Sequence, residues 1–193
     1  MGLYTLVQKG GSVMVVFGTS CTNARRRAYD LLAMAVQTEW GLPQLPSIAR
    51  RDGGKPYFPD HPELEFNLSH SGELILCALD LAPVGVDIQM VKAMRPGLPA
   101  RVCSPQEQRW LEEQPDLWRG FAQLWAMKEA HVKYTGTGLT RSISSIPTPL
   151  LSSGQTHGTV EGLYVQIYSG GGWMGACCST HAPPSQITWV TLP

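Results

Sequence analysis

The sequence predicts an α+β fold, because its strand-like and helix-like segments do not follow the repeating order of a doubly wound parallel sheet. Short apolar runs separated by tight turns follow one another directly, which is typical of antiparallel strands. Two long segments, at 23–40 and 116–134, instead place apolar residues at helical spacing. Six strands are expected after the first helix, at 64–68, 74–79, 84–88, 159–168, 173–178 and 187–191.

The N-terminal segment predicts a hairpin of two further strands, Leu3–Val7 and Val13–Phe17. Thr22 or Asn23 is expected to cap the first helix, since both residue types are favoured at helix N-termini. The segment 41–62 is rich in glycine and proline and therefore predicts a loop.

The second part of the chain follows a linker at Lys92–Pro99, which contains two prolines and a glycine. Ser104, Pro105 and the acidic first turn after them predict the start of a helix. A division at this linker gives two halves, 1–92 and 93–193, each expected to be built from helix packed on a small sheet.

The composition predicts a cytoplasmic protein that binds neither nucleic acid nor membranes. Lys plus Arg number 15 and Asp plus Glu number 15, so the basic excess of a nucleic-acid-binding protein is missing. The 5 cysteines are odd in number and include no CxxC pair, which predicts free thiols in a reducing compartment. The N-terminus lacks the pattern of a signal peptide, and no apolar stretch approaches the length of a membrane span.

The second long helix carries charges beside the face that should be buried. Its apolar stripe comprises Phe121, Leu124, Trp125 and Val132. Lys128 lies on this stripe, and Glu129 and Lys133 lie one turn apart on its edge. Such charges are costly unless they are paired or bind a ligand. The residues alone leave two interpretations open: salt bridges with lysine stems along the surface, or a functional site.

An aspartate interrupts the apolar strand expected at 84–88. Asp87 and Gln89 point to one face of this strand, while Val86 and Ile88 point to the other. Asp87 can be a turn or cap residue at the end of the strand, or it can be an oxygen ligand for a hard cation. Magnesium takes few protein ligands, and Glu129 supplies a second carboxylate if helix and strand lie side by side.

Two polar motifs accompany these charges. Ser69, His70 and Ser71 precede a glycine, in what the composition predicts to be a turn between strands. This motif is either a plain hairpin turn or a set of donors for a phosphate. The sequence Gly54-Lys55-Pro56 is either a solvated loop or a lysine held stiffly toward a ligand.

The order and spacing of these motifs resemble a known family. GKPYF, FNLSHSGE, VGVDIQ and FAQLWAMKEAHVKYTGTGL follow one another as in the Sfp-like class of 4′-phosphopantetheinyl transferases. The resemblance runs from about Lys55 to Leu139, extends weakly to the last strands, and is poor over the first fifty residues. WxxKExxxK after a GVDI strand is its most specific part.

The resemblance implies two pseudo-symmetric α+β halves with coenzyme A bound in the cleft between them. It implies transfer of the 4′-phosphopantetheine group of coenzyme A to a serine of an apo acyl- or peptidyl-carrier protein, with release of 3′,5′-ADP. The implied enzyme depends on Mg²⁺, takes coenzyme A as donor substrate and a carrier protein as partner, and is expected to be a monomer.

The resemblance also implies roles for the charged side chains. Asp87 and Glu129 would hold Mg²⁺ at the pyrophosphate of coenzyme A. Elementary chemistry agrees, because a serine hydroxyl that attacks the β-phosphorus needs a proton acceptor, for which Glu129 is the candidate. Lys133 would neutralise the charge that develops on phosphate oxygens, so Glu129, Lys133 and Asp87 are the expected catalytic residues.

The remaining signature residues are implied to bind coenzyme A. His70 and Lys133 would contact phosphate oxygens. Lys55 and Ser69 would hold the end that carries the adenosine 3′-phosphate. Lys128 belongs to the same signature and would orient the site.

Two features depart from the family pattern. Where bacterial relatives usually carry an acid, this chain has Gln89, whose amide oxygen can serve as a metal ligand but adds no charge. Weaker metal binding is therefore expected. The basic residues expected around the first helix are limited to Arg25-Arg26-Arg27, of which Arg26 is the candidate for the 3′-phosphate and the others are expected to be solvated.

Two alternatives remain open at this point. The chain can be a weak or inactive protein of the same fold that holds coenzyme A or a carrier, which Gln89 favours and the retained charges disfavour. An unrelated Mg²⁺-dependent phosphohydrolase would account for the carboxylates but not for the order of the motifs.

Overall fold

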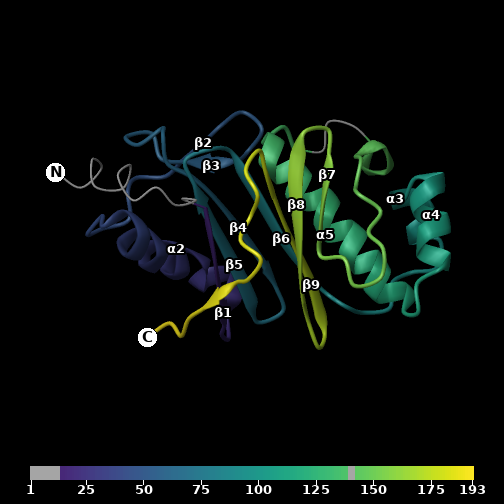
Figure 1. The fold of residues 1–193 in the computed structure, drawn as a ribbon. Coiled ribbons are helices and arrows are strands. Elements are labelled where there is room, and N and C mark those ends of the chain that lie inside the picture. The colour runs from purple at the N-terminus through teal and green to yellow at the C-terminus, as the bar shows by residue number, and fades with distance from the viewer. Residues whose placement is uncertain (1–13, 139–141) are drawn as a thin grey trace.

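The computed structural model of the protein describes residues 14–138 and 142–193 (Figure 1). These residues form an α+β fold with two four-stranded sheets and several helices, as the sequence predicts. The first sheet has the strand order β10-β1-β5-β4 and consists of β1 (Val15–Ser20), β4 (Glu65–Ser71), β5 (Leu74–Asp80) and β10 (Thr188–Trp189). The second has the order β6-β9-β8-β7 and consists of β6 (Val84–Met90), β7 (His157–Val160), β8 (Leu163–Gly170) and β9 (Trp173–Ser179).

The helices are α2 (Ala24–Trp40), α3 (Leu98–Val102), α4 (Pro105–Glu112), α5 (Leu117–Thr135) and the short 3-10 helix η2 (Ile143–Ser145). Helix α2 covers the first sheet and α5 covers the second (Figure 1). A small strand pair, β2 (Ala49–Arg50) and β3 (Pro56–Tyr57), forms inside the segment that the sequence predicts as loop.

Burial of apolar side chains holds each helix on its sheet. Leu31 and Val36 of α2 are fully buried in one cluster with Phe66 of β4. Leu124 of α5 is buried in a second cluster with Ile167 of β8. Each fully buried side chain of this size contributes about 1.5–3 kcal/mol relative to exposure, so this packing fixes the position of α5 over its sheet.

A third apolar cluster lies between the two sheets. It contains Val86 and Ile88 of β6 together with Val16 of β1 and Leu76 of β5. Because side chains alternate along a strand, Asp87 points to the opposite face of β6, as the sequence predicts. That face is covered by α5.

Helix α5 begins and ends where the sequence indicates. The Asp116 side chain accepts hydrogen bonds from the backbone N–H groups of Trp118 and Arg119, and Gly136 ends the helix with a φ of 67°. In α4, Ser104 caps the helix in a capping box. Asn23 occupies the cap position of α2 in the left-handed region, with no side-chain cap hydrogen bond, so its expected capping bond is missing.

The sheets meet at a seam between β4 and β6. The side chains of three alternate β4 residues accept hydrogen bonds from the backbone N–H groups of three alternate β6 residues. These bonds join Val86 to Asn67 (3.0 Å), Ile88 to Ser69 (3.2 Å) and Met90 to Ser71 (3.1 Å). We call this set the β4–β6 side-chain ladder.

Three sequence predictions need correction. Ser69–Ser71 belongs to β4 and not to a turn, and the turn lies at Gly72 and Glu73. The single strand expected at 159–168 is two strands, because Glu161 and Gly162 both adopt positive φ and form a turn. Part of the expected linker is helical, as α3. The first strand of the predicted N-terminal hairpin, at 3–7, lies outside the described residues.

The division of the chain into halves at 1–92 and 93–193 stays a prediction. Strand β6, from the first half, pairs with β9 of the second, and β10, near the C-terminus, pairs with β1. Both parts of the chain therefore contribute strands to both sheets.

Gly85 of β6 allows the closest approach between helix and sheet. A Cβ atom at this position would lie 1.9 Å from the carbonyl oxygen of Ala130 and 2.5 Å from the backbone nitrogen of Tyr134. We therefore expect Gly85→Ala to lower the free energy of unfolding by about 2 kcal/mol or more, since α5 has to move away from β6. Thermal unfolding followed by circular dichroism measures this change.

Gly171→Ala is the matched control, because a Cβ atom there would meet nothing within 4 Å. We expect it to unfold close to the wild-type temperature. Equal unfolding temperatures for the Gly85 and Gly171 variants would contradict the proposed close contact.

Candidate active site

Asp87 lies at the seam of the two sheets, and its side chain is almost fully buried. Its Oδ1 atom accepts a hydrogen bond from Ser69 Oγ at 2.7 Å and forms an ion pair with Lys133 Nζ at 2.6 Å. The residue is 6% exposed. A buried carboxylate with a charged partner and a hydroxyl donor is held in one orientation.

Lys133 reaches this aspartate from the last turns of α5. Its ammonium also donates to the backbone carbonyl of Val86 at 3.1 Å and, more weakly, to that of Leu68 at 3.5 Å. It therefore contacts both strands of the seam. The side chain is 26% exposed, so it is not fully enclosed by the protein.

Glu129 lies one turn before Lys133 on the same edge of α5 and is half-buried. Burial raises the pKa of Glu129 above its ordinary value, and the negative charge of Asp87 raises it further, while Lys133 opposes both effects. The structure thus brings Asp87, Glu129 and Lys133 together from β6 and α5. Two carboxylates that raise each other's cost of ionisation, with one ammonium paired to Asp87, form an arrangement that an additional cation would stabilise.

The chemistry of these donors fits a magnesium ion. All of them are oxygens, and Mg²⁺ is typically held by one or two carboxylates together with substrate phosphates. Among residues 14–138 and 142–193 there is no group of three or more His, Cys, Asp or Glu that could hold a metal. Gln89 is half-buried on the Asp87 face of β6, and its amide donates only weakly to the Met90 carbonyl, at 3.5 Å.

Lys55 is buried and already has three partners. Its ammonium donates to the backbone carbonyls of Val84 at 3.1 Å and Tyr134 at 3.2 Å, and it lies 3.3 Å from a carboxylate oxygen of Glu65. Burial lowers the pKa of Lys55, and Glu65 opposes this effect. In this position Lys55 connects the start of β6 to the end of α5.

A small cavity of about 170 Å³ lies beside Lys55 and Lys133. Its other lining residues are Gly53, Gly54, Pro56, Val132, Gly136 and Gly138. The cavity therefore joins the Gly-Gly-Lys-Pro motif to the end of α5.

Lys128 was expected to help bind coenzyme A, but the structure encloses its side chain. Its side chain is 0% exposed, donates to the backbone carbonyl of Ile146 at 2.7 Å and forms an ion pair with Glu107 at 2.9 Å. The same glutamate accepts from Thr148 and closes the capping box of α4. Lys128 therefore connects α5 to α4 and cannot contact a ligand directly in this arrangement, because an enclosed ammonium with complete partners is shielded from solvent.

The other residues expected to bind coenzyme A lie in different environments: Ser69 and Arg26, expected at the 3′-phosphate, and His70, expected at a phosphate oxygen. Ser69 is buried and bound to Asp87, whereas His70, the next residue, is exposed. Arg26 is exposed on α2. Its neighbour Arg27 pairs with Asp30 and donates to the carbonyl of the C-terminal residue.

Sequence reasoning missed three residues that hold the strands and the helix around this site in place. Asn67 and Ser71 belong to the β4–β6 side-chain ladder, and their alternation with Ser69 was the available signal. Gly85 was read only as part of a motif, although a glycine inside an apolar strand indicates close approach of another backbone.

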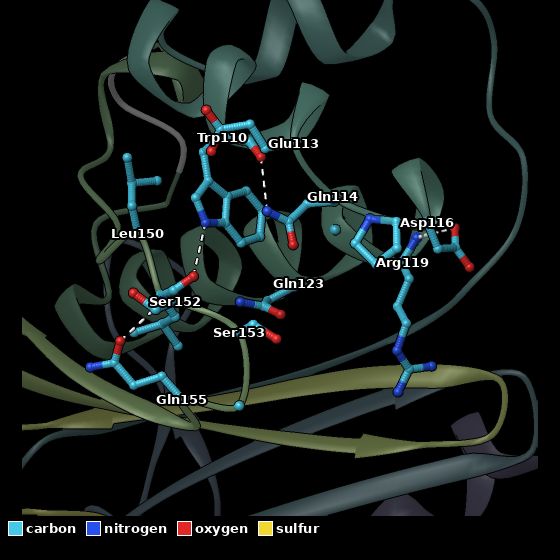
Figure 2. A pocket seen from close by; sticks show the side chains of 14 residues that line it. Trp110, Glu113, Gln114, Asp116, Arg119, Gln123, Leu150, Ser152, Ser153 and Gln155 are labelled. Carbon is cyan, nitrogen blue, oxygen red and sulfur yellow. Dashed lines mark hydrogen bonds between the residues drawn. The ribbon is translucent and has the colours of Figure 1, made fainter.

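A larger cavity, of about 500 Å³, lies at the opposite end of α5 (Figure 2). Trp110 forms part of its wall, with the indole nitrogen donating to the carbonyl of Leu151 at 2.9 Å. Asp116 and Arg119 of the first turn of α5 lie on another side. None of the residues expected to bind coenzyme A or Mg²⁺ lines this cavity, so its volume alone does not mark it as the active site.

Comparisons with known proteins agree with the motif order. A family model described as the 4′-phosphopantetheinyl transferase superfamily matches residues 83–171. A 4′-phosphopantetheinyl transferase of Bacillus subtilis is 37% identical over 134 residues, covering 68% of this chain and 59% of that protein. The 4′-phosphopantetheinyl transferase Sfp of Bacillus subtilis (strain 168) is 34% identical over 155 residues, covering 75% of this chain and 68% of that protein.

Two further findings complete the comparison. A crystal structure of the Thermotoga maritima holo-[acyl-carrier-protein] synthase aligns with a TM-score of 0.40 at 19% identity, covering 50% of this chain and 61% of that one. In the part of the chain that the structure describes, no helix has the length and apolar character needed to cross a membrane.

The raised pKa of Glu129 predicts a pH-dependent effect on stability. A carboxyl whose pKa is raised on folding binds its proton more tightly in the folded state, so its ionised form destabilises the metal-free protein at neutral pH. We expect Glu129→Gln to unfold at a higher temperature than wild type at about pH 7 with chelator present. The gain should vanish at about pH 4, where the unfolded glutamate is itself largely protonated.

Thermal unfolding at both pH values measures this effect. Glu112→Gln, at an exposed position on α4, is the control and should change the unfolding temperature little at either pH. A wild-type protein that is as stable as Glu129→Gln at neutral pH would contradict the electrostatic interpretation.

Proposed function

Because this chain belongs to the Sfp-like 4′-phosphopantetheinyl transferase family, we propose that it transfers the 4′-phosphopantetheine group of coenzyme A to a serine of an apo carrier protein. The observation that carries the proposal is the convergence of Asp87 from β6 with Glu129 and Lys133 from α5. Membership alone leaves the activity open, since the chain spans 59% of the length of one relative and 68% of another.

The proposed architecture consists of two pseudo-symmetric halves, 1–92 and 93–193, with the active site between them. The similar arrangement of α2 on the first sheet and α5 on the second supports this division. The seam between β4 and β6 then forms the floor of the site.

Coenzyme A is proposed to bind along the seam with its phosphates toward Lys133. The partly exposed side chain of Lys133 supports this position, as does the cavity that it lines. The exposed His70 is available for a phosphate oxygen, and the exposed Arg26 for the 3′-phosphate. Lys55 lines the cavity but has to give up a protein partner before it binds a phosphate directly.

The oxygen donors of Asp87 and Glu129 are proposed to hold Mg²⁺, with the amide oxygen of Gln89 as a third, neutral ligand. When bound, this ion supplies positive charge that neutralises the diphosphate of coenzyme A. Every other function in the proposed reaction falls to side chains of the protein.

The reaction forms a bond between the carrier serine oxygen and the β-phosphorus of coenzyme A. The bond from that phosphorus to the bridging oxygen breaks, and 3′,5′-ADP leaves with the electron pair. Glu129 accepts the serine proton. Lys133 stabilises the negative charge on the phosphate oxygens, and the ion pair with Asp87 keeps the ammonium of Lys133 in place.

A reducing, cytoplasmic location and a monomeric state complete the proposal. All 5 cysteines are unpaired, and four of them are buried, which fits a compartment without disulfide formation. The second candidate function is a protein of the same fold that binds coenzyme A or a carrier without transfer. The neutral Gln89 favours this candidate, since the site has one negative charge fewer than a site with three carboxylates.

Mass spectrometry of the carrier tests the proposal. The protein is incubated with coenzyme A, Mg²⁺ and an apo carrier domain. We expect the carrier to gain the mass of phosphopantetheine. Unmodified carrier together with tight coenzyme A binding would support the non-transferring candidate, and coenzyme A cleavage without carrier modification would indicate a hydrolase.

Glu129→Gln is expected to lower the rate of transfer at least about 100-fold, since it removes the proton acceptor and one carboxylate of the metal site. The circular dichroism spectrum should remain that of wild type, because the replacement has nearly the same shape. Glu112→Gln is again the control and should transfer at the wild-type rate. Near-normal turnover by Glu129→Gln would show that this residue is neither the base nor an essential ligand.

Gln89→Glu is expected to bind Mg²⁺ more tightly, because it adds a negative charge on the Asp87 face of β6. The Mg²⁺ concentration that gives half-maximal transfer should fall several-fold. Gln108→Glu, on α4, changes charge by the same amount away from the site and serves as control. An unchanged metal dependence of Gln89→Glu would place residue 89 outside the metal site.

A further inference from the structure

Ser69 has a bonding pattern that differs from that of a phosphate ligand. Its Oγ accepts the backbone N–H of Ile88 at 3.2 Å and donates to Asp87 Oδ1 at 2.7 Å. The side chain lies in β4, and the residue is 6% exposed, as is Asp87. Both bonds are therefore largely shielded from water, where a hydrogen bond is electrostatically stronger than at the surface.

The first of these bonds directs the second. A serine hydroxyl has a single proton and two acceptor positions. Once one acceptor position is taken by the N–H of Ile88, the rotation of the hydroxyl that remains favourable directs its proton to Asp87. Ser69 thus links the backbone of β6 at Ile88 to the carboxylate of Asp87, so the position of that backbone sets the orientation of the carboxylate.

The result is an Asp87 side chain whose two oxygens differ. Ser69 and Lys133 both donate to Oδ1, one from β4 and one from α5. Two donors on one oxygen fix the carboxylate plane, and Oδ2 is the oxygen left for a further ligand. A carboxylate oriented in this way loses less conformational freedom when it binds a cation.

The neighbouring members of the β4–β6 side-chain ladder lack this second bond. Asn67 and Ser71 accept backbone N–H groups of β6 at 3.0 and 3.1 Å, as Ser69 does at 3.2 Å. Of these three residues, Ser69 is the one whose side chain also donates to a carboxylate. The ladder alone therefore does not explain the geometry of Ser69.

We propose that Ser69 is a positioning residue that orients Asp87 for a divalent cation, and not a ligand of the adenosine 3′-phosphate. The proposal rests on the proposed function as far as the cation is concerned. It assigns to Ser69 a role through Asp87, on the buried side of the site, while the exposed His70 next to it faces solvent.

Binding of Mn²⁺ tests the proposal without any catalytic turnover. The free Mn²⁺ signal in electron paramagnetic resonance is followed during titration of the full chain, with and without coenzyme A. Ser69→Ala should bind Mn²⁺ about tenfold more weakly than wild type, as is typical when a residue that orients a metal ligand is removed. Its affinity for coenzyme A in metal-free buffer should equal that of wild type.

Ser71→Ala is the matched control. It removes a hydroxyl that accepts an equivalent backbone N–H from β6 but does not contact Asp87. We expect it to bind Mn²⁺ with wild-type affinity, and both variants are first compared with wild type by circular dichroism. If Ser69→Ala does not fold, two other variants replace it. Ser69→Thr keeps the hydroxyl, and Ser69→Val has a shape similar to threonine without the hydroxyl. Only the valine variant should lose Mn²⁺ affinity.

Three results would overturn the proposal. Wild-type Mn²⁺ affinity in Ser69→Ala would show that Asp87 needs no such support. Equal weakening in the Ser69 and Ser71 variants would indicate a purely structural ladder. Loss of metal-free coenzyme A affinity with unchanged Mn²⁺ affinity would return Ser69 to the 3′-phosphate. If wild type binds no Mn²⁺ and modifies no carrier, the proposed function fails as well, whereas an active wild type with indifferent Ser69→Ala refutes the role of Ser69 alone.

Discussion

The seam between β4 and β6 is the constraint on which the rest of the structure depends. These strands belong to different sheets, and polar side chains of β4 take the place of backbone carbonyls as acceptors for the N–H groups of β6. Buried N–H groups without acceptors would be costly, so each side chain of the ladder is required where it lies. Lys55 adds a further link beside this seam, since its ammonium bonds to backbone carbonyls of both β6 and α5. A site placed on this seam is therefore held by two sheets and one helix at once.

Two lysines of α5 form ion pairs in different surroundings, Lys128 with Glu107 of α4 and Lys133 with Asp87 of β6. Lys128 and Glu107 are enclosed, close to each other and supplied with further hydrogen bonds, so both charges are fully compensated. Glu129 is half-buried beside Asp87, and the raised pKa shows that Lys133 does not fully compensate the two carboxylates. An incompletely compensated carboxylate in a partly open position destabilises the protein unless it serves a ligand. This difference, and not the motif that the two lysines share, separates their roles.

Long periodic segments could be predicted from the sequence, and contacts between distant segments could not. The boundaries of α5 followed from Asp116, Gly136 and the apolar stripe, because capping and periodicity are local properties. Ser69 was assigned to a turn because its neighbours are polar, and only the partner strand β6 explains why polar residues continue a strand there. Lys128 looked like a ligand because its partner Glu107 lies on another helix, which no local pattern reveals.

The charges of Asp87 and Glu129 give a physical reason for a neutral residue at position 89. Two carboxylates and the ammonium of Lys133 leave one negative charge uncompensated before any cation binds. A third carboxylate on the same face of β6 would raise the pKa of Glu129 further, since like charges at short distance disfavour ionisation. The metal-free protein would then be less stable at neutral pH, although the same charge would attract a cation more strongly. A neutral amide at residue 89 therefore spares the metal-free protein this cost, and in the proposed cation site it would do so at the expense of cation affinity.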